Sequence, residues 1–184
     1  ANRAVLAHRL CLGLKAELGN SVDLTTIYDV SHNIAKIEDH QIHGVNCTCV
    51  VHRKGATRAF SGDKMSTHDV FKQTGQPVLV PGDMGRGSWI MAGPVSGQNI
   101  AFGSACHGAG RAMSRTVARK TIDPEIQKNE LDEQGVIVHA ATKNILSEEA
   151  PAAYKNVDNV IENTHAANLA RPVLRLEPIA VIKG

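Results

Sequence analysis

The sequence predicts an α+β protein in which small mixed sheets and helices are combined. Helix and strand signals follow one another without a regular β-α-β alternation, which argues against a doubly wound parallel sheet. The chain of 184 residues is 42% hydrophobic and 21% charged, the balance of a globular domain rather than of a disordered chain. Aromatic residues are only 3% of the total, so the core is expected to consist mainly of Val, Ile, Leu and Ala.

Four helices are expected from apolar spacing and from residues that begin or end helices. Apolar residues recur near helical spacing in the N-terminal stretch, and Gly19 and Asn20 form a plausible stop. Asp123 is a cap, with Pro124 as the first helical residue and Gly135 as the stop. The expected helices lie within residues 5–18, 108–120, 123–135 and 156–168.

Strands are indicated by β-branched and apolar runs between turn residues. Residues 33–42 are ambiguous between helix and strand, and His43 with Gly44 favours a hairpin return into the next run. Two short buried strands are expected on either side of a glycine-rich turn near Gly85. The expected extended segments are 24–30, 45–51, 76–82, 88–93, 135–141 and 171–184.

Charge and cysteine content restrict the class of protein only weakly. A formal net charge of +2 permits a polyanionic partner without arguing for one. The four cysteines have no disulfide-framework spacing, which favours a reducing, cytoplasmic location. No membrane-spanning run is present, and the N-terminal stretch is a poor signal peptide. A helix already under way at the first residue suggests a chain cut from a longer one.

The stretch "GSACHGAGR" places His107 among residues too small to build a core. If a helix starts near Gly108, its free N–H groups lie beside His107 and are ready for a phosphate. Arg111, Arg115 and Arg119 would then share one helix face, a pattern that fits a phosphodiester backbone. A solvated charged face is the alternative, and spacing alone favours it.

The stretch "VPGDMGRGSW" contains Gly82, Gly85 and Gly87 between two apolar runs. Such a turn can direct backbone N–H groups into one concavity that binds anions. An ordinary glycine-rich hairpin is the alternative, and it is favoured on spacing alone. No Walker-type lysine follows, so the turn is not a P-loop.

Further histidines, cations and cysteines leave alternatives open. His32 follows an apolar run, where a lone histidine is more often structural than a ligand, and Lys54 belongs to a second basic cluster, "VHRKGATR". Cys47 and Cys49 with nearby histidines lack the tight Cys-x-x-Cys spacing of zinc sites. Cys106 beside His107 resembles a thiol–imidazole pair, although adjacent side chains seldom face each other.

Six stretches together resemble one family. They are "YDVSHNIAKIEDH", "VHRKGATRAF", "GQPVLVPGDMG", "GSACHGAGRAMSR", "EEAPAAYKNVDNV" and "PIAVIKG". They resemble the C-terminal portion of the RtcB-type RNA-splicing ligases, in family order, from Tyr28 to Gly184. The resemblance implies one catalytic portion over residues 1–184, with an incomplete RtcB-like fold. Without it, spacing supports only a phosphate-binding α+β domain.

The resemblance implies an RNA ligase that joins a 3′-phosphate or 2′,3′-cyclic phosphate end to a 5′-hydroxyl end, with GTP and Mn²⁺. His107 matches the family's nucleophile, which carries GMP as a phosphoramidate, and His32 matches a manganese ligand. The basic residues that match positions needed for activity, as phosphate or RNA contacts, are Lys54, Arg111 and Arg115. The residues that match the nucleotide site are Asn33, Pro81, Gly82, Asp83, Met84, Ser88, Gly108, Ala109, Gly110, Tyr154 and Lys183.

The chain departs from the family pattern in two ways. Asp83 stands where the family usually has serine, and a carboxylate beside a triphosphate should repel it unless a metal or Arg86 offsets the charge. Asp83→Ser is predicted to tighten GTP binding. The family's upstream aspartate, cysteine, histidines and Asn-x-x-x-Glu motif are not recognisable. The chain alone is therefore predicted to be weakly active or inactive without an N-terminal portion, and some lineages add an archease-type activator. The alternative is a non-catalytic RNA- or nucleotide-binding fragment that needs a partner chain.

Overall fold

The computed structural model describes residues 2–19, 21, 24–97 and 100–184. Its helices, counting single 3₁₀ turns as η, are α1 (Asn2–Leu18), η1 (Gly62–Met65), α2 (Phe71–Thr74), α3 (Arg115–Thr121), α4 (Pro124–Glu133), α5 (Lys143–Glu148), η2 (Pro151–Ala153) and α6 (Val157–Ala166). Its strands are β1 (Asn33–Ile42), β2 (Val45–Lys54), β3 (Ala56–Arg58), β4 (Pro77–Asp83), β5 (Gly87–Ala92), β6 (Ser104–Cys106), β7 (Ile137–Ala140), β8 (Arg171–Leu176) and β9 (Ala180–Lys183). This confirms the expected α+β class.

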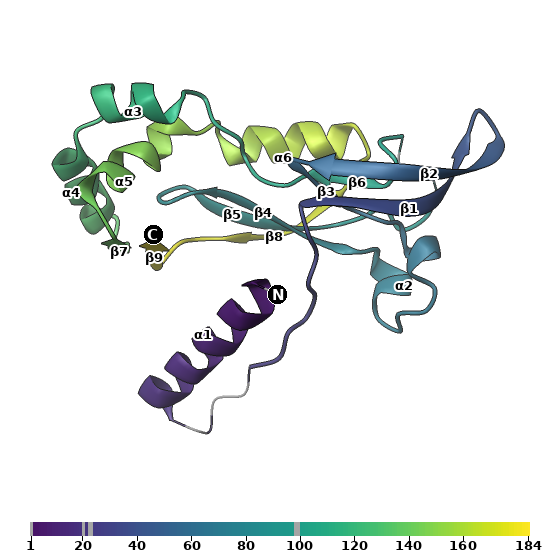
Figure 1. Cartoon of the computed structure of the whole chain (residues 1–184), viewed down its shortest axis with the longest axis horizontal. Coiled ribbons are helices and arrows are strands. Elements are labelled where there is room, and N and C mark those ends of the chain that lie inside the picture. Colours follow the sequence, from purple (N-terminus) through teal and green to yellow (C-terminus); the bar gives the residue numbers. More distant parts are fainter. Residues whose placement is uncertain (1, 20, 22–23, 98–99) are drawn as a thin grey trace.

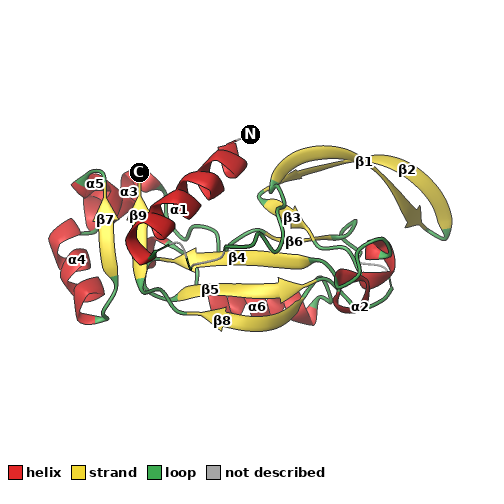
Figure 2. Ribbon diagram, turned by 90° about the horizontal axis from the view of Figure 1, so that it is seen from below, coloured by secondary structure: helices red, strands yellow, loops and turns green. Residues whose placement is uncertain are grey.

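The centre of the molecule is the antiparallel sheet β4-β5-β8, which α6 covers on one face (Figures 1 and 2). Because side chains alternate along a strand, Val78 and Val80 of β4 point toward α6, and both are fully buried. They pack with Val157 and Ile161 of α6 in the main apolar cluster. Leu79, between the two valines, is 59% exposed on the opposite face. That second face of the sheet is therefore open.

A long hairpin stands at one end of the central sheet (Figure 2). Strands β1 and β2 pair antiparallel along their whole length, and the turn uses His43 and Gly44, both at positive φ. This confirms the expected hairpin return and settles the ambiguous residues 33–42 as strand. After the hairpin, β3 pairs antiparallel with β6. The hairpin is thereby joined to the strand that precedes His107.

The opposite end of the molecule is a small unit of α3, α4, α5 and the strands β7 and β9 (Figure 1). Asp123 caps α4 by accepting hydrogen bonds from the N–H groups of Glu125 and Ile126, and Pro124 begins the helix, as the sequence predicts. Strands β7 and β9 pair in parallel, with Ala140 opposite Lys183. A second apolar cluster of Met84, Leu131 and Val136 joins this unit to the turn after β4.

The N-terminal part of the chain differs in part from the sequence expectations. The strand expected at 24–30 is wrong: these residues have no regular structure, because no neighbouring strand pairs with them. The first helix is confirmed, and Gly19 adopts φ +89° after it, while Asn20 lies outside the described residues. None of the α1 residues is buried, and Val5, Leu6, Leu10 and Leu18 of its apolar stripe are more than half exposed. In the described part of the chain, no helix is long and apolar enough to cross a membrane.

The helix expected at 108–120 is shorter than its sequence pattern. It begins at Arg115, because the Ser114 side chain accepts a hydrogen bond from the N–H of Val117 and caps it there. Gly110 has φ +74°, which a helix cannot accommodate. His107 therefore lies on a loop rather than beside a helix N-terminus. Arg111 also lies outside the helix, so the three arginines do not share one helix face.

Candidate nucleotide and phosphate site

The base of the β1–β2 hairpin brings predicted site residues together. Asn33 begins β1 and pairs with Lys54, the last residue of β2. Residues opposite each other in an antiparallel pair have Cα atoms about 4.5–5.5 Å apart. His32 immediately precedes Asn33 and so lies at the same end of the hairpin. All three side chains are exposed there, which leaves them free to meet a ligand.

His107 reaches this place from the other sheet. Ala56 of β3 pairs with Cys106 of β6, and His107 is the next residue. The rings of His32 and His107 stack with their centroids 5.2 Å apart and an angle of 14° between their planes. His107 is only half-buried, so its ring is accessible.

Gly55 leaves space beside the His107 ring. It links β2 to β3 at φ +71°, a conformation that a residue with a β-carbon rarely adopts. A β-carbon at this position would lie 3.5 Å from Cε1 of His107. Glycine therefore both makes the turn after Lys54 and keeps side-chain atoms away from the imidazole.

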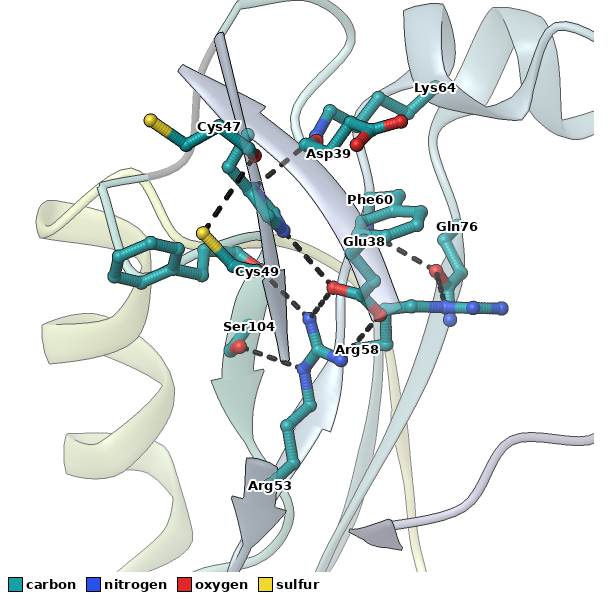
Figure 3. Close-up of polar contacts among 12 residues, drawn as sticks. Glu38, Asp39, Cys47, Cys49, Arg53, Arg58, Phe60, Lys64, Gln76 and Ser104 are labelled. Carbon is teal, nitrogen blue, oxygen red and sulfur yellow. Dashed lines mark hydrogen bonds and ion pairs between the residues drawn. The ribbon is translucent and has the colours of Figure 1, made fainter. Parts of the chain in front are cut away.

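A buried ion pair fixes the strand that precedes His107 (Figure 3). Arg53 of β2, 2% exposed, donates from both terminal nitrogens to the two carboxylate oxygens of Glu38, each at 2.8 Å. It also donates to Ser104 Oγ at 2.9 Å and to the carbonyl oxygen of Phe102 at 2.8 Å. Burial alone would raise the pKa of Glu38, but hydrogen bonds from Arg53 and His40 outweigh it and lower that pKa. The pair ties the hairpin to the start of β6.

Cys106 is directed away from the His107 ring. Its sulfur lies 3.3 Å from Thr164 Oγ1 of α6, which donates to it. Burial raises the pKa of the Cys106 thiol despite this hydrogen bond. A thiol held against α6 and kept protonated does not suit the thiol–imidazole alternative.

The glycine-rich turn is the hairpin between β4 and β5, which is the alternative that spacing favoured, and the Asp83 carboxylate accepts from the N–H groups within it. One oxygen of the fully buried Asp83 carboxylate accepts hydrogen bonds from the N–H of Gly85 at 3.0 Å and of Arg86 at 2.8 Å. The other oxygen lies 3.0 Å from Nε of Arg86 as an ion pair, without hydrogen-bond alignment. The Arg86 guanidinium also donates to the carbonyl oxygens of Pro151 and Tyr154. Arg86 thus offsets the carboxylate, which meets the condition under which Asp83→Ser need not tighten GTP binding.

A cavity of about 370 Å³ lies on the open side of the central sheet. Pro81 of β4 pairs with Ser88 of β5, so both face the same side. The volume is within the range of about 300–1,000 Å³ typical of small-molecule sites. Predicted nucleotide-site residues that line it are Pro81, Gly82, Asp83, Met84, Ser88 and Lys183.

The loop after His107 lies against the same strand. The N–H of Ala109 donates to the carbonyl oxygen of Pro81 at 2.9 Å, and Ala109 is buried in the main core. A β-carbon on Gly108 would lie 3.1 Å from that oxygen, so only glycine fits here without a shift. The carbonyl of Gly110 accepts from the N–H of Lys155 at 3.0 Å. The histidine loop is thereby fixed between the cavity and the Tyr154 segment.

The predicted cationic residues converge on a carboxylate that the sequence did not single out. Oε1 of Glu149 lies 3.4 Å from a terminal nitrogen of Arg111 and 3.6 Å from one of Arg115. Oε2 accepts a 2.6 Å hydrogen bond from the Tyr154 hydroxyl and lies 3.4 Å from Nζ of Lys183. Each of these four side chains was assigned to phosphate or nucleotide binding.

Arg111 and Tyr154 also contact each other directly. They form an isolated antiparallel bridge, Arg111 donates to the Tyr154 hydroxyl at 3.0 Å, and its guanidinium lies 4.8 Å from the ring centroid. Burial, then the hydrogen bond to Glu149, raises the pKa of Tyr154 to about 12. For Glu149, burial raises the pKa, but the bond from Tyr154 and the cations outweigh it and lower that pKa. At neutral pH the cluster therefore holds a neutral phenol and an ionised carboxylate.

His32 is the one predicted metal ligand, and a neutral imidazole suits manganese. In the described ranges, no group of three or more His, Cys, Asp or Glu side chains is arranged to hold a metal ion. His32 with the neighbouring His107 does not by itself make a manganese site.

The structure thus arranges the predicted residues in three adjoining groups. His32, Asn33, Lys54 and His107 lie at the hairpin base, and the turn after β4 surrounds the cavity. Lys183 belongs both to the cavity and to the group around Glu149. Sequence reasoning missed Glu149 and its neighbour Glu148, although both lie in the stretch "EEAPAAY", which is part of the family resemblance. The available signal was two adjacent carboxylates five and six residues before Tyr154.

Fold and site together define an α+β protein with an accessible histidine pair, and with a cavity and a cationic cluster that share Lys183. The whole chain, residues 1–184, matches the family described as tRNA-splicing ligase RtcB. The chain belongs to the tRNA-splicing ligase RtcB family.

Curated relatives carry the same family name and are longer. The tRNA-splicing ligase RtcB of Thermococcus kodakarensis is 42% identical across 100% of this chain, which covers 39% of that relative. Those of Methanopyrus kandleri and Archaeoglobus fulgidus are 47% and 41% identical across 91% and 100% of this chain, which covers 18% and 39% of them. The chain spans less than half the length of each of these relatives, as expected of a portion of a longer family member.

Proposed function

We propose that the chain is the part of an RNA ligase that carries the nucleophilic histidine and the guanylate pocket. The ligase would join RNA 3′-phosphate or 2′,3′-cyclic phosphate ends to 5′-hydroxyl ends, in tRNA splicing or RNA repair, with GTP and Mn²⁺. Family membership supports the ligase class, because the relatives are named tRNA-splicing ligases. The observation that carries the site is the accessible His107 ring, 5.2 Å from His32 and on the loop that contacts Pro81.

In the proposed reaction a ring nitrogen of His107 attacks the α-phosphorus of GTP. A P–N bond forms, the bond from that phosphorus to the bridging oxygen breaks, and pyrophosphate leaves with the electron pair. The ring loses its other nitrogen proton to solvent, so the product is a phosphoramidate with a neutral imidazole ring and one negative charge on the phosphoryl group. An oxygen of the RNA 3′-phosphate then displaces the histidine from GMP. Finally the RNA 5′-hydroxyl attacks that 3′-phosphate and releases GMP.

The surrounding residues have proposed roles that follow from their positions. Lys54 lies at the hairpin base with His32 and offsets phosphate charge near the attacked phosphorus. The cavity residues, including Lys183, hold the guanylate, and Tyr154 is linked to Lys183 through Glu149. Arg111 and Arg115 face the RNA phosphates. Manganese ligands beyond His32 would come from parts of the ligase outside the described residues, as would an archease-type activator.

Covalent labelling tests the proposal. The chain is incubated with GTP labelled at the α-phosphorus and with Mn²⁺, alone and with the upstream portion of the ligase. We expect weak labelling alone, stronger labelling with that portion, and acid-labile, alkali-stable label that His107→Ala abolishes. His165→Ala is the matched control, because His165 is exposed on α6 and should label normally. Label retained by His107→Ala would exclude His107 as the nucleophile.

The alternative, a non-catalytic binding fragment, has its own outcome. The small cavity and the cation cluster suit nucleotide or RNA binding without chemistry. Under this alternative, equilibrium dialysis detects bound GTP, while no covalent label forms even with the upstream portion present. Robust labelling by the 184-residue chain alone would instead contradict the predicted need for that portion.

A further inference from the structure

The acidic pair Glu148–Glu149 stands at the centre of the cation cluster. Glu148 is the last residue of α5 and Glu149 follows it. A helix C-terminus disfavours negative charge, so these carboxylates depend on the surrounding cations for stabilisation. The side chains of Glu148 and Glu149 are only 18% and 14% exposed. They are therefore held in place rather than free in solvent.

The two glutamates have different partners. Glu148 lies 3.5 Å from Nε of Arg115 and 3.5 Å from Nε of Arg119, both on α3. Glu149 alone reaches the Tyr154 hydroxyl and Lys183, in addition to the arginines. Glu148 is thus an arginine partner, whereas Glu149 also contacts residues of the proposed nucleotide pocket.

We infer that Glu149 is a positioning residue of the guanylate site, which orients the Tyr154 phenol and the Lys183 ammonium together through one carboxylate oxygen. This inference rests on the proposed function, since it deepens the role of that pocket. The Tyr154 hydroxyl donates to Glu149 and accepts from Arg111, so both of its hydrogen-bonding capacities are used and its ring orientation is fixed.

Lys183 is positioned less tightly, which suits a residue that must also bind phosphate. Its Nζ lies 3.4 Å from Glu149, and an ammonium group has three donors. Two of them remain for a ligand in the adjoining cavity. Arg111, Arg115, Arg119 and Lys183 together outnumber the two carboxylates, so two positive charges stay unbalanced. The cluster can therefore accept a phosphate while Glu149 stays in place.

Replacing Glu149 with glutamine tests whether Glu149 acts by positioning Tyr154 and Lys183 or only through its negative charge. The amide keeps the shape but offers one acceptor oxygen, and its NH₂ group would face either the guanidiniums or the Tyr154–Lys183 side. Glu148→Gln is the matched control, because it removes the same charge from the arginines without contacting Tyr154 or Lys183. If charge alone mattered, both variants would bind GTP more tightly.

GTP binding by the 184-residue chain is measured by equilibrium dialysis with labelled GTP and Mn²⁺ at fixed ionic strength. We expect Glu149→Gln to bind GTP about tenfold more weakly, which is about 1.4 kcal/mol of binding free energy, because one carboxylate no longer holds both Tyr154 and Lys183. Glu148→Gln should bind as tightly as wild type or more tightly. A wild-type chain that binds no GTP, either alone or with the upstream portion of the ligase, would contradict the proposed function. Wild-type affinity for GTP in Glu149→Gln would contradict the positioning role of Glu149 but not the proposed function.

A second readout does not depend on nucleotide. The chain has two tyrosines, so in a Tyr28→Phe background the ultraviolet titration of phenolate reports Tyr154 alone. Because Glu149 helps to raise the pKa of Tyr154, Glu149→Gln should lower it from about 12, whereas Glu148→Gln should leave it unchanged. An unshifted titration in Glu149→Gln would overturn the positioning role, even if the variant folds and binds GTP poorly.

Discussion

Two carboxylates at opposite ends of the molecule, Glu38 and Glu149, are both paired with arginine but in different ways. Glu38 meets Arg53 through two 2.8 Å hydrogen bonds, and the Arg53 side chain is 1% exposed. Glu149 divides its oxygens among two arginines, a lysine and a tyrosine at 2.6–3.6 Å, and its cations are 25–65% exposed. The buried Glu38–Arg53 pair, here called the closed pair, holds strands together. The partly exposed contacts of Glu149, here called the open cluster, can exchange partners with a ligand.

The largest effect is expected from breaking the closed pair. Glu38→Ala leaves the Arg53 guanidinium buried with its main acceptor removed, and removing one partner of a buried pair costs about 3–5 kcal/mol. Urea unfolding, followed by far-ultraviolet circular dichroism, measures the loss. The double variant Glu38→Leu with Arg53→Met removes both charges and should lose much less. A loss below about 1 kcal/mol in Glu38→Ala would mean that the pair is not closed to water.

A smaller effect is expected at the open cluster. Glu149→Gln should lower the free energy of unfolding by only about 1 kcal/mol, because the amide keeps the shape of the side chain and the partly exposed cations that it releases can turn toward water. The same urea titration, run beside Glu38→Ala, makes the comparison. A loss as large as that of Glu38→Ala would remove the distinction between the two regions.

The pH dependence of folding stability should differ between the two regions at alkaline pH, because only the Glu149 cluster contains Tyr154. The pKa values of Glu38 and Glu149 are both lowered, so their stabilisation is present above the ordinary value of 4.5 and is lost as pH falls through the folded values. The pKa of Tyr154 is raised to about 12, so its contribution is present below pH 10 and is lost as pH rises from 10 through about 12. Thermal unfolding across pH 9–12 should show this alkaline loss, and Tyr154→Phe should reduce it.

The smallest effect is expected for Glu148→Gln. Its contacts with Arg115 and Arg119 are 3.5 Å long, and those arginines are 65% and 47% exposed. Such solvated pairs contribute about 0–1 kcal/mol, and salt should reduce that further. Urea unfolding at low and high salt checks both points. A salt-independent loss above about 1 kcal/mol would place Glu148 with Glu38 instead.

Local signals predicted the local structure well. The Asp123 cap, Pro124 and the positive-φ Gly135 define α4, and these residues determine backbone geometry without distant partners. The same reasoning failed at 24–30, because a strand needs a neighbouring strand. It also failed at Gly108, because Ser114 supplies a cap six residues later. Residues 108–114 have helical spacing in the sequence, but the positive φ of Gly110 prevents a helix from forming there.

The sequence alone determined the family resemblance and the residue types of the candidate site, because short motifs carry both. It also determined the helix caps and turns, which depend on neighbours in the chain. Only the tertiary structure decided that His107 would stack on His32, and that Glu149 would gather Arg111, Tyr154 and Lys183. Those contacts join residues up to 75 positions apart in the printed sequence. They arise because β3 pairs with β6 and β7 pairs with β9, and strand pairing over such distances leaves no local pattern.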